Sequence, residues 1–171
     1  IVNTDLGWCL LYAGHGGEAV DQFRKTLEID PKYVSARWGL GASYAQQRAF
    51  KDAVAELKLA VTLSEGSPLI SGHLGYVYGL GGLPADAKGS LAELNTLSAR
   101  QYVPSTALAL VYTGLGDKAQ ALEWLGRAVD EHDFSLVFLD VAPWFETLRA
   151  EPGYESLRRK MQLPDRSAVA R

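Results

Sequence analysis

Residues 38–57 read WGLGASYAQQRAFKDAVAEL, and the placement of Leu, Gly, Tyr and Ala in this stretch decides the fold. The same kinds of residue recur 34 positions earlier and 34 and 68 positions later along the chain. The columns with the clearest agreement are Leu6, Leu40, Leu74 and Leu108; Leu10, Tyr44, Tyr78 and Tyr112; Ala19, Ala53, Ala87 and Ala121; and Phe23, Leu57, Leu91 and Leu125. A fixed period of this length is the signature of a repeat protein.

Each repeat unit is predicted to form a helix, a tight turn and a second helix. Its apolar residues lie three or four positions apart, which is the spacing of one helix face. Segments rich in Gly, such as GHGG at 14–17 and GGLPA at 81–85, separate the two apolar runs of a unit. Gly or Ala on the first helix is expected to face Ala on the second, because helices approach closely only where side chains are short.

The columns resemble the tetratricopeptide repeat, whose period is 34 residues and whose pattern runs Trp, Leu-Gly, Tyr, Ala, Phe, Ala, Pro. The second unit matches most of that pattern through Leu40-Gly41, Tyr44, Ala53, Leu57 and Ala60. The Trp column of the family holds other residue types here, and its closing Pro is retained only once, at Pro31. The resemblance implies an all-α, right-handed α-solenoid with four helix-turn-helix units, at about residues 1–33, 34–67, 68–101 and 102–133.

The C-terminal part is predicted to close the array. Residues 134–163 are expected to form a helical cap with a polar outer face that includes Arg158, because an array end needs such a face. Residues 164–171 lack periodicity and are expected to be disordered.

The last third of the chain is similar to the closing segment of repeat regions in large bacterial signalling proteins, where such arrays follow a winged-helix, kinase or cyclase domain. The pieces that carry this resemblance are YVPS at 102–105, LGDKAQALEWL at 115–125 and PWFETLR at 143–149. Because Ile1 already lies inside a helical pattern, we expect the chain to be a piece of a larger protein.

Composition argues against several classes of function. The 171 residues carry 17 Lys and Arg against 20 Asp and Glu, a formal net charge of −3, and this balance does not favour nucleic-acid binding. The single cysteine, Cys9, has no partner for a disulfide or a zinc site and is interpreted as an apolar filler on a helix. The sequence contains no apolar run long enough to cross a membrane, and we expect a cytoplasmic protein.

No group of residues in the sequence is typical of catalysis or of a metal centre. His15, His73 and His132 lie whole repeats apart, without Cys or Glu at ligand spacing, and are interpreted as surface polar residues. The run DEHD at 130–133 lacks the spacing of a calcium loop and is interpreted as a solvated helix end. We therefore predict no enzyme activity, no metal and no cofactor.

The resemblance implies that the first helices of the units line a concave face. The residues at the corresponding columns form the predicted partner-binding groove: Trp8, Leu11, Tyr12, Trp38, Ala42, Gln46, Tyr76, Leu80, Thr106 and Leu110. Large aromatic anchors of this kind dominate interface energetics. Small residues in the same columns are expected to give access to the anchors, among them Gly72, Gly79 and Gly114.

The groove is expected to bind an apolar or aromatic-bearing protein segment. Chaperone-binding members of the family clamp an acidic C-terminal tail with Lys, Arg and Asn. The neighbouring positions here hold Asp5, Gly39, His73 and Ala107, which disfavour such a tail.

The predicted function is thus a non-catalytic protein-interaction scaffold in a larger bacterial regulatory protein. The aromatic residues are also compatible with packing on neighbouring helices. Self-association is the alternative, through the groove or through an open N-terminal face with Val2, Leu10 and Phe23. A small-ligand sensor is a remote alternative, because no titratable cluster accompanies the aromatic residues.

Overall fold

Helices follow one another along residues 2–164, the part of the chain that this computed structural model describes. In chain order they are α1 (Val2–Tyr12), α2 (Gly16–Ile29), α3 (Val34–Gln46), α4 (Phe50–Leu63), α5 (Pro68–Leu80), α6 (Pro84–Ser98), α7 (Ser105–Leu115), α8 (Lys118–Asp130), the 3-10 helices η1 (Phe134–Phe138) and η2 (Pro143–Leu148), and α9 (Pro152–Lys160). The described residues contain no strand, and the predicted all-α helical repeat solenoid is confirmed. The tail predicted to be disordered lies outside the described residues from position 165 onward.

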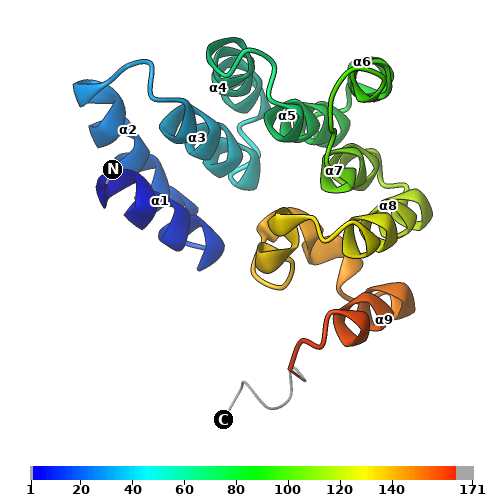
Figure 1. Cartoon of the computed structure of the whole chain (residues 1–171). Helices are drawn as coiled ribbons and strands as arrows, with labels where there is room; N and C mark the ends of the chain where they lie inside the picture. The colour runs from blue at the N-terminus through cyan, green and yellow to red at the C-terminus, as the bar shows by residue number, and fades with distance from the viewer. Residues whose placement is uncertain (1, 165–171) are drawn as a thin grey trace.

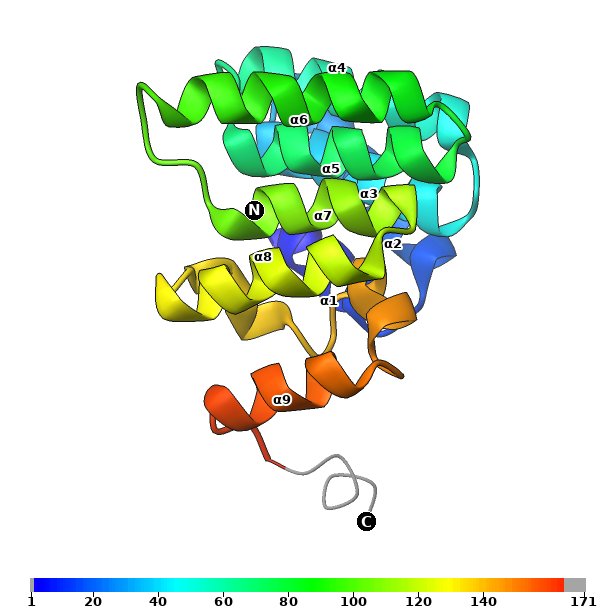
Figure 2. The ribbon, with the colours of Figure 1, turned by 90° about the vertical axis from the view of Figure 1, so that its right-hand side faces the viewer.

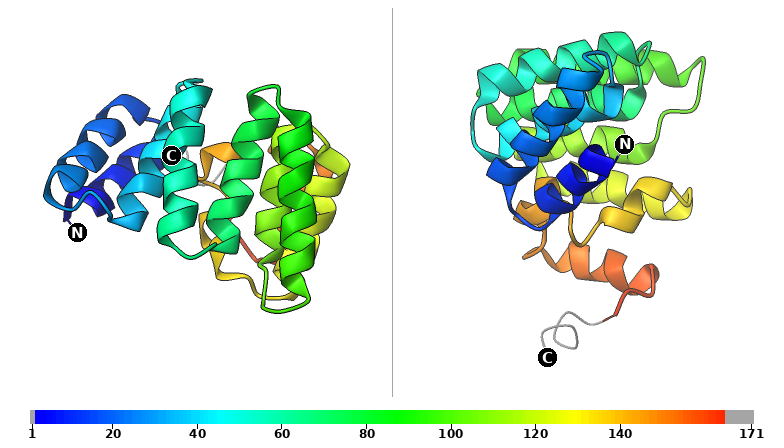
Figure 3. Two further views of the ribbon diagram at one scale, coloured as in Figure 1. Left: turned by 90° about the horizontal axis from the view of Figure 1, so that it is seen from above. Right: turned by 90° about the vertical axis from the view of Figure 1, so that its left-hand side faces the viewer.

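The first eight helices form an arc. Each of them packs on the next along the chain. Figure 1 shows α1, α3, α5 and α7 on the inner side of the arc, with α2, α4, α6 and α8 outside them. Seen from above in Figure 3, α1 and α2 lie at one end of the arc and the last helices lie at the other. The first helices of successive pairs therefore share the concave side.

Short side chains allow the two helices of a pair to approach closely. A methyl group added at Gly41 of α3 would lie 2.7 Å from Cγ of Leu57 and 3.2 Å from the carbonyl oxygen of Ala53, both on α4. At Gly75 of α5 an added methyl group would lie 2.9 Å from Cβ of Ser90 on α6. The contact expected between the small column of a first helix and the second helix is thus present in these two pairs.

Glycines also bring α5 and α7 together across two neighbouring units. A methyl group at Gly79 would lie 2.3 Å from the carbonyl carbon of Gly114, and one at Gly72 would lie 2.6 Å from the carbonyl oxygen of Ala107. These glycines were expected to leave the groove accessible, and that expectation is wrong. They face the backbone of the neighbouring helix, because only a residue without a side chain fits at so short a distance.

We predict that Gly79→Ala lowers the free energy of unfolding by several kcal/mol, because the added methyl group forces α5 and α7 apart. Urea unfolding followed by circular dichroism measures the change. Gly89→Ala is the matched control: Gly89 lies inside α6, where an added methyl group would meet nothing within 4 Å. That substitution is expected to stabilise the protein by up to about 1 kcal/mol. Equal stability of Gly79→Ala and the parent would contradict the close approach.

Candidate functional site

Residues 134–148, which follow the repeats and which we call the returning segment, fold back into the concave side of the arc. In Figure 1 it lies between α1 and α7, and Figure 2 shows α9 beyond α8 at the end of the array. The ring of Phe138 on η1 stacks on Tyr12 of α1, with centroids 4.9 Å apart. The indole of Trp144 on η2 lies edge-on to His73 of α5 at 4.5 Å and to Tyr12 at 5.8 Å. Part of the segment predicted to cap the end of the array thus covers its inner face.

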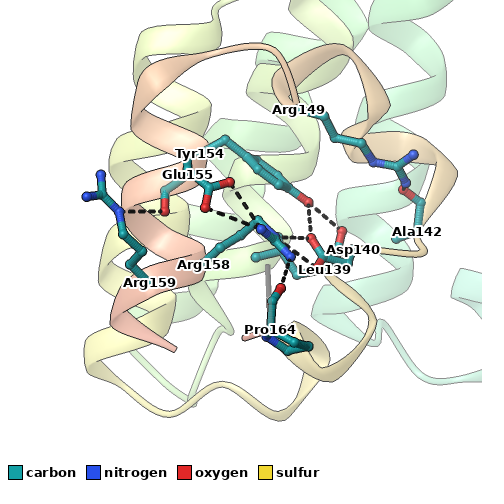
Figure 4. A network of polar contacts seen from close by, with 9 residues as sticks. All are labelled: Leu139, Asp140, Ala142, Arg149, Tyr154, Glu155, Arg158, Arg159 and Pro164. Atoms are coloured by element: carbon teal, nitrogen blue, oxygen red, sulfur yellow. Dashed lines mark hydrogen bonds and ion pairs between the residues drawn. The ribbon is translucent and has the colours of Figure 1, made fainter. Parts of the chain in front are cut away.

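A buried arginine on α9 fixes the turn between η1 and η2 (Figure 4). Arg158 is only 2% exposed, and its Nε lies 2.9 Å from each carboxylate oxygen of Asp140. Its Nη1 donates to Glu155 at 3.1 Å, and the Tyr154 hydroxyl donates to the carbonyl oxygen of Leu139 at 2.7 Å. The expectation that Arg158 lies on the outer face of the cap is wrong, because the returning turn covers it and supplies its partners.

A buried carboxylate fixes the start of η1. Asp133 is 6% exposed and accepts hydrogen bonds from the Thr106 hydroxyl at 2.6 Å and from the Thr106 backbone N–H at 3.2 Å. Its other oxygen accepts from the backbone N–H of Ser135 at 3.0 Å. The interpretation of residues 130–133 as a solvated helix end is therefore wrong for Asp133. Protein donors on α7 and at the start of η1 take the place of water around this buried carboxylate.

Between the concave side and the returning segment lies a cavity of about 380 Å³, which we call the aromatic cavity. Its aromatic walls come from the helices and from the returning segment alike: Trp8, Tyr12, Trp38, Phe134, Phe138, Trp144 and Phe145. Several of these rings contact one another, for example Trp8 and Trp38 at 5.0 Å in an edge-to-face arrangement. The Trp8 indole N–H is held by the Ser35 hydroxyl at 3.0 Å. The walls are therefore fixed by mutual packing.

The structure distributes the residues of the predicted groove over two cavities and the core. The aromatic cavity takes Trp8, Tyr12, Trp38, Thr106 and Leu110. A second cavity of about 290 Å³, which shares His73 and Trp144 with the first, takes Ala42, Gln46, Tyr76 and Leu80. Leu11 is fully buried in the core, so its placement in the groove is wrong. It lies on the side of α1 that packs against the rest of the array, where no partner reaches it.

His73 is the functional-site residue that sequence reasoning missed. It was interpreted as a surface residue, but it is 2% exposed, because the Trp144 ring covers it and Trp38 packs edge-on at 5.2 Å. Its Nδ1–H donates to the carbonyl oxygen of Leu69 at 3.2 Å, which leaves Nε2 as a bare acceptor. Burial lowers the pKa of His73 to about 4, so the ring is neutral at pH 7. The only signal for this burial was the group of aromatic residues in the segment that covers it, among them Trp144.

Unpartnered polar atoms gather around the aromatic cavity. Among the described residues, four buried side-chain atoms have no hydrogen-bond partner: Trp38 Nε1, His73 Nε2, Ser135 Oγ and Arg149 Nε. The first three belong to residues that line the aromatic cavity. Buried polar groups in folded proteins are nearly always paired. Three of these four atoms therefore belong to side chains that border the aromatic cavity, but the atoms themselves are buried inside its wall.

The aromatic cavity carries little charge at neutral pH. Burial raises the pKa of Tyr12 to about 12. At the second cavity, burial together with the Glu146 carboxylate raises the pKa of Tyr76 to about 12. Asp5 is the carboxylate among the lining residues, and it is exposed. Cys9 also lines the cavity and is exposed, so its interpretation as a packed filler is wrong. Its side of α1 faces the opening of the cavity, where no helix covers it.

Two further findings concern residues 2–164. No group of three or more His, Cys, Asp and Glu side chains in this range is placed to hold a metal ion. No helix in the same range combines the length and the apolar character that crossing a membrane requires.

We predict that stability depends on the protonation of His73. The pKa is about 6.5 in the unfolded chain and about 4 in the folded protein, so below pH 6.5 the unfolded state binds a proton that the folded state excludes. Neutral His73 makes its full contribution to the free energy of unfolding above about pH 6.5. This contribution, about 3 kcal/mol in total, is lost as the pH falls towards 4. Denaturant unfolding across this range should show a shallower pH dependence for His73→Phe. The control His15→Gln, at an exposed turn, should follow the parent, and equal slopes for His73→Phe and the parent would contradict the burial.

We also predict that Asp140→Ala lowers the free energy of unfolding by about 3 kcal/mol, because it leaves the buried Arg158 charge without its main partner. The matched control is Asp130→Ala. Asp130 pairs with Lys160, also on α9, but both side chains of that pair are exposed. Its loss should change stability by less than about 1 kcal/mol. Thermal or urea unfolding of the two variants measures the difference, and equal effects would argue against the buried network.

Comparison with protein families gave a match for the first part of the chain. Residues 4–68 match the family described as the tetratricopeptide repeat. A search of the curated proteins gave no significant match. Tetratricopeptide repeats generally mediate protein–protein interaction, and the proteins built from them are generally non-catalytic scaffolds. The match spans α1 to α4, and the helices that follow continue the same all-α solenoid.

Proposed function

We propose that this chain is a non-catalytic protein-interaction scaffold that binds an apolar or aromatic-bearing segment of a partner protein on its concave side. The observation that carries the proposal is the exposed apolar surface around the two cavities. Phe134 is 73% exposed and Phe138 is 39% exposed at the aromatic cavity, and Leu80 is 39% exposed at the second cavity. Apolar side chains grouped beside a concave site are typical of a surface that a partner covers.

The returning segment forms part of the surface on which a partner would dock. Because Trp144 already fills part of the concave side, the available surface combines the inner helices with η1 and η2. A partner then docks on a surface with preformed walls, which lowers the entropic cost of binding. Few lining residues carry charge, which favours an apolar segment over an acidic tail.

We propose that this surface belongs to a larger bacterial regulatory protein in the cytoplasm. The support is the resemblance of the C-terminal third to the closing segment of such proteins. In the same proposal, the helix pairs from α1–α2 to α7–α8 are four tetratricopeptide units, and residues 134–163 form one closing element. The support for this division is the order of the elements, since four helix pairs are followed by η1, η2 and α9.

Self-association is the second candidate function. Val2 is 80% exposed and Leu6 is 46% exposed on α1, at the end of the array. Phe23, which was expected on the same open face, is fully buried and cannot contribute. Light scattering across a range of concentrations distinguishes the two functions, since a monomer at all concentrations excludes self-association.

We predict that Leu80→Glu weakens partner binding by at least about tenfold, because it places a charge in the apolar contact surface. The experiment captures partners from the source lysate and then measures the affinity of the purified partner by calorimetry. Leu59→Glu is the matched control, since Leu59 has similar exposure, 47%, on the outer helix α4. The expected result is a partner that binds the parent and Leu59→Glu equally and Leu80→Glu at least about tenfold more weakly. Equal affinity for all three proteins would overturn the concave site.

A further inference from the structure

The aromatic cavity has the dimensions of a small-molecule site. Its volume of about 380 Å³ lies within the range of roughly 300–1,000 Å³ in which proteins hold small ligands. The inner helices form one wall, and Phe138 and Trp144 of the returning segment contribute to the other. Because the returning segment closes one side, the cavity favours a compact molecule over an extended peptide that would run the length of the concave face.

The cavity presents open ring surface to a ligand. Trp8, Tyr12 and Trp38 line it and are only half-buried, and Phe138 is 39% exposed. Neighbouring rings stand at steep angles to one another, 71° between Trp8 and Trp38 and 62° between Tyr12 and Trp144. The faces of these rings therefore point in several directions. The face of an aromatic ring carries negative electrostatic potential, whereas its edge is positive.

A carboxylate stands beside these rings. Asp5 lies on the same face of α1 as Trp8 and Tyr12, which follow it at positions i+3 and i+7, and all three line the cavity. The Asp5 side chain is exposed and has no hydrogen-bond or ion-pair partner among the described residues. No Lys or Arg belongs to the described residues that line the cavity, and His73 is neutral at pH 7. The Asp5 charge is therefore not compensated within the site.

These observations define the charge and the character of the ligand. An anion would meet the Asp5 carboxylate and the negative ring faces, with no cationic lining side chain to offset them. A strongly hydrated cation would lose its water in a cavity whose walls are mostly aromatic. An alkylated ammonium group is weakly hydrated and packs among apolar rings, and both the ring faces and a carboxylate attract it.

We propose that the aromatic cavity binds a small organic cation with a quaternary ammonium group. The alkylated nitrogen lies among the rings of Trp8, Trp38 and Phe138, and the Asp5 carboxylate attracts its charge. The ligand contacts ring atoms at the surface of the cavity and needs no access to the polar atoms that are buried inside the wall. The proposal goes beyond the scaffold function and does not depend on it, since no partner protein takes part.

Choline and neohexyl alcohol test the proposal, because they have nearly the same shape and differ in charge. Neohexyl alcohol has a carbon atom where choline has its quaternary nitrogen, and the charge of choline does not change with pH. The chain has four tryptophans, of which Trp8, Trp38 and Trp144 line the cavity, while Trp124 on α8 does not and serves as the reference. Titration followed by the indole N–H signals in ¹H–¹⁵N spectra therefore reports both affinity and location.

The expected result is saturable binding of choline that shifts the three cavity indole signals and leaves the Trp124 signal unchanged. Neohexyl alcohol should bind at least about tenfold more weakly, since it gains neither the cation–π attraction nor the attraction to Asp5. Equal affinity of the two compounds for the parent protein would overturn the proposal, as would a lack of choline binding or shifts centred on Trp124.

Asp5→Asn checks the assigned carboxylate, and Asp21→Asn is the matched control. Asp21 is also exposed, but it lies on the outer helix α2 and does not line the cavity. Asp5→Asn should weaken choline binding by about three- to tenfold and leave the binding of neohexyl alcohol unchanged. Asp21→Asn should match the parent protein with both compounds. Equal choline affinities of the two variants would overturn the role of Asp5.

Phe138→Leu checks the aromatic wall, because it replaces a ring by a smaller apolar side chain at a partly exposed position. The affinity for choline should fall by at least about threefold, and the affinity for neohexyl alcohol should change less. An unchanged choline affinity would overturn the assignment of this ring to the site. Circular dichroism checks the fold of each variant, and the comparison of the two compounds on the parent protein decides the matter if a variant fails to fold.

Discussion

The insertion of Trp144 into the concave side is the interaction on which the rest of the site depends. Its indole contacts Tyr12 on α1 and His73 on α5, and it is 8% exposed. A buried tryptophan removes about 150–250 Å² from water, which is worth roughly 4–6 kcal/mol at 25 cal/mol per Å². This one side chain therefore connects the first and third helix pairs and divides the concave side into two cavities.

Polar anchors at the start of η1 and in the turn between η1 and η2 hold the chain that leads to Trp144. The Asp133 carboxylate fixes the start of η1 to α7, and Arg158 fixes the turn after η1 to α9 through Asp140. Neither 3-10 helix is long enough to be stable alone, so these bonds and the buried leucines around them define the path of the chain. A wall held in this way is preorganised, which is what a binding site requires.

The close spacing of the inner helices α5 and α7 shapes the surface that the returning segment covers. The glycine contacts between α5 and α7 bring two inner helices together at backbone distance, and His73 lies on α5 next to Gly72. The ring of His73 contacts Trp144 of the returning segment and Trp38 of α3. Its Nε2 and the Trp38 indole N–H remain buried without hydrogen-bond partners, which costs free energy of folding.

The sequence by itself determined the repeat and the order of helices, because both follow from apolar spacing, which depends on neighbours a few positions away. The resemblance to the tetratricopeptide repeat added the expectation that Trp8, Tyr12 and Trp38 face the concave side. Only the tertiary structure decided that residues 134–148 cover that face, that His73 and Arg158 are buried, and that Leu11 belongs to the core. Burial of a helix face depends on which distant segment packs against it, and periodicity contains no information about that partner. The pairing of Trp144 with Tyr12, from opposite ends of the chain, is the clearest example.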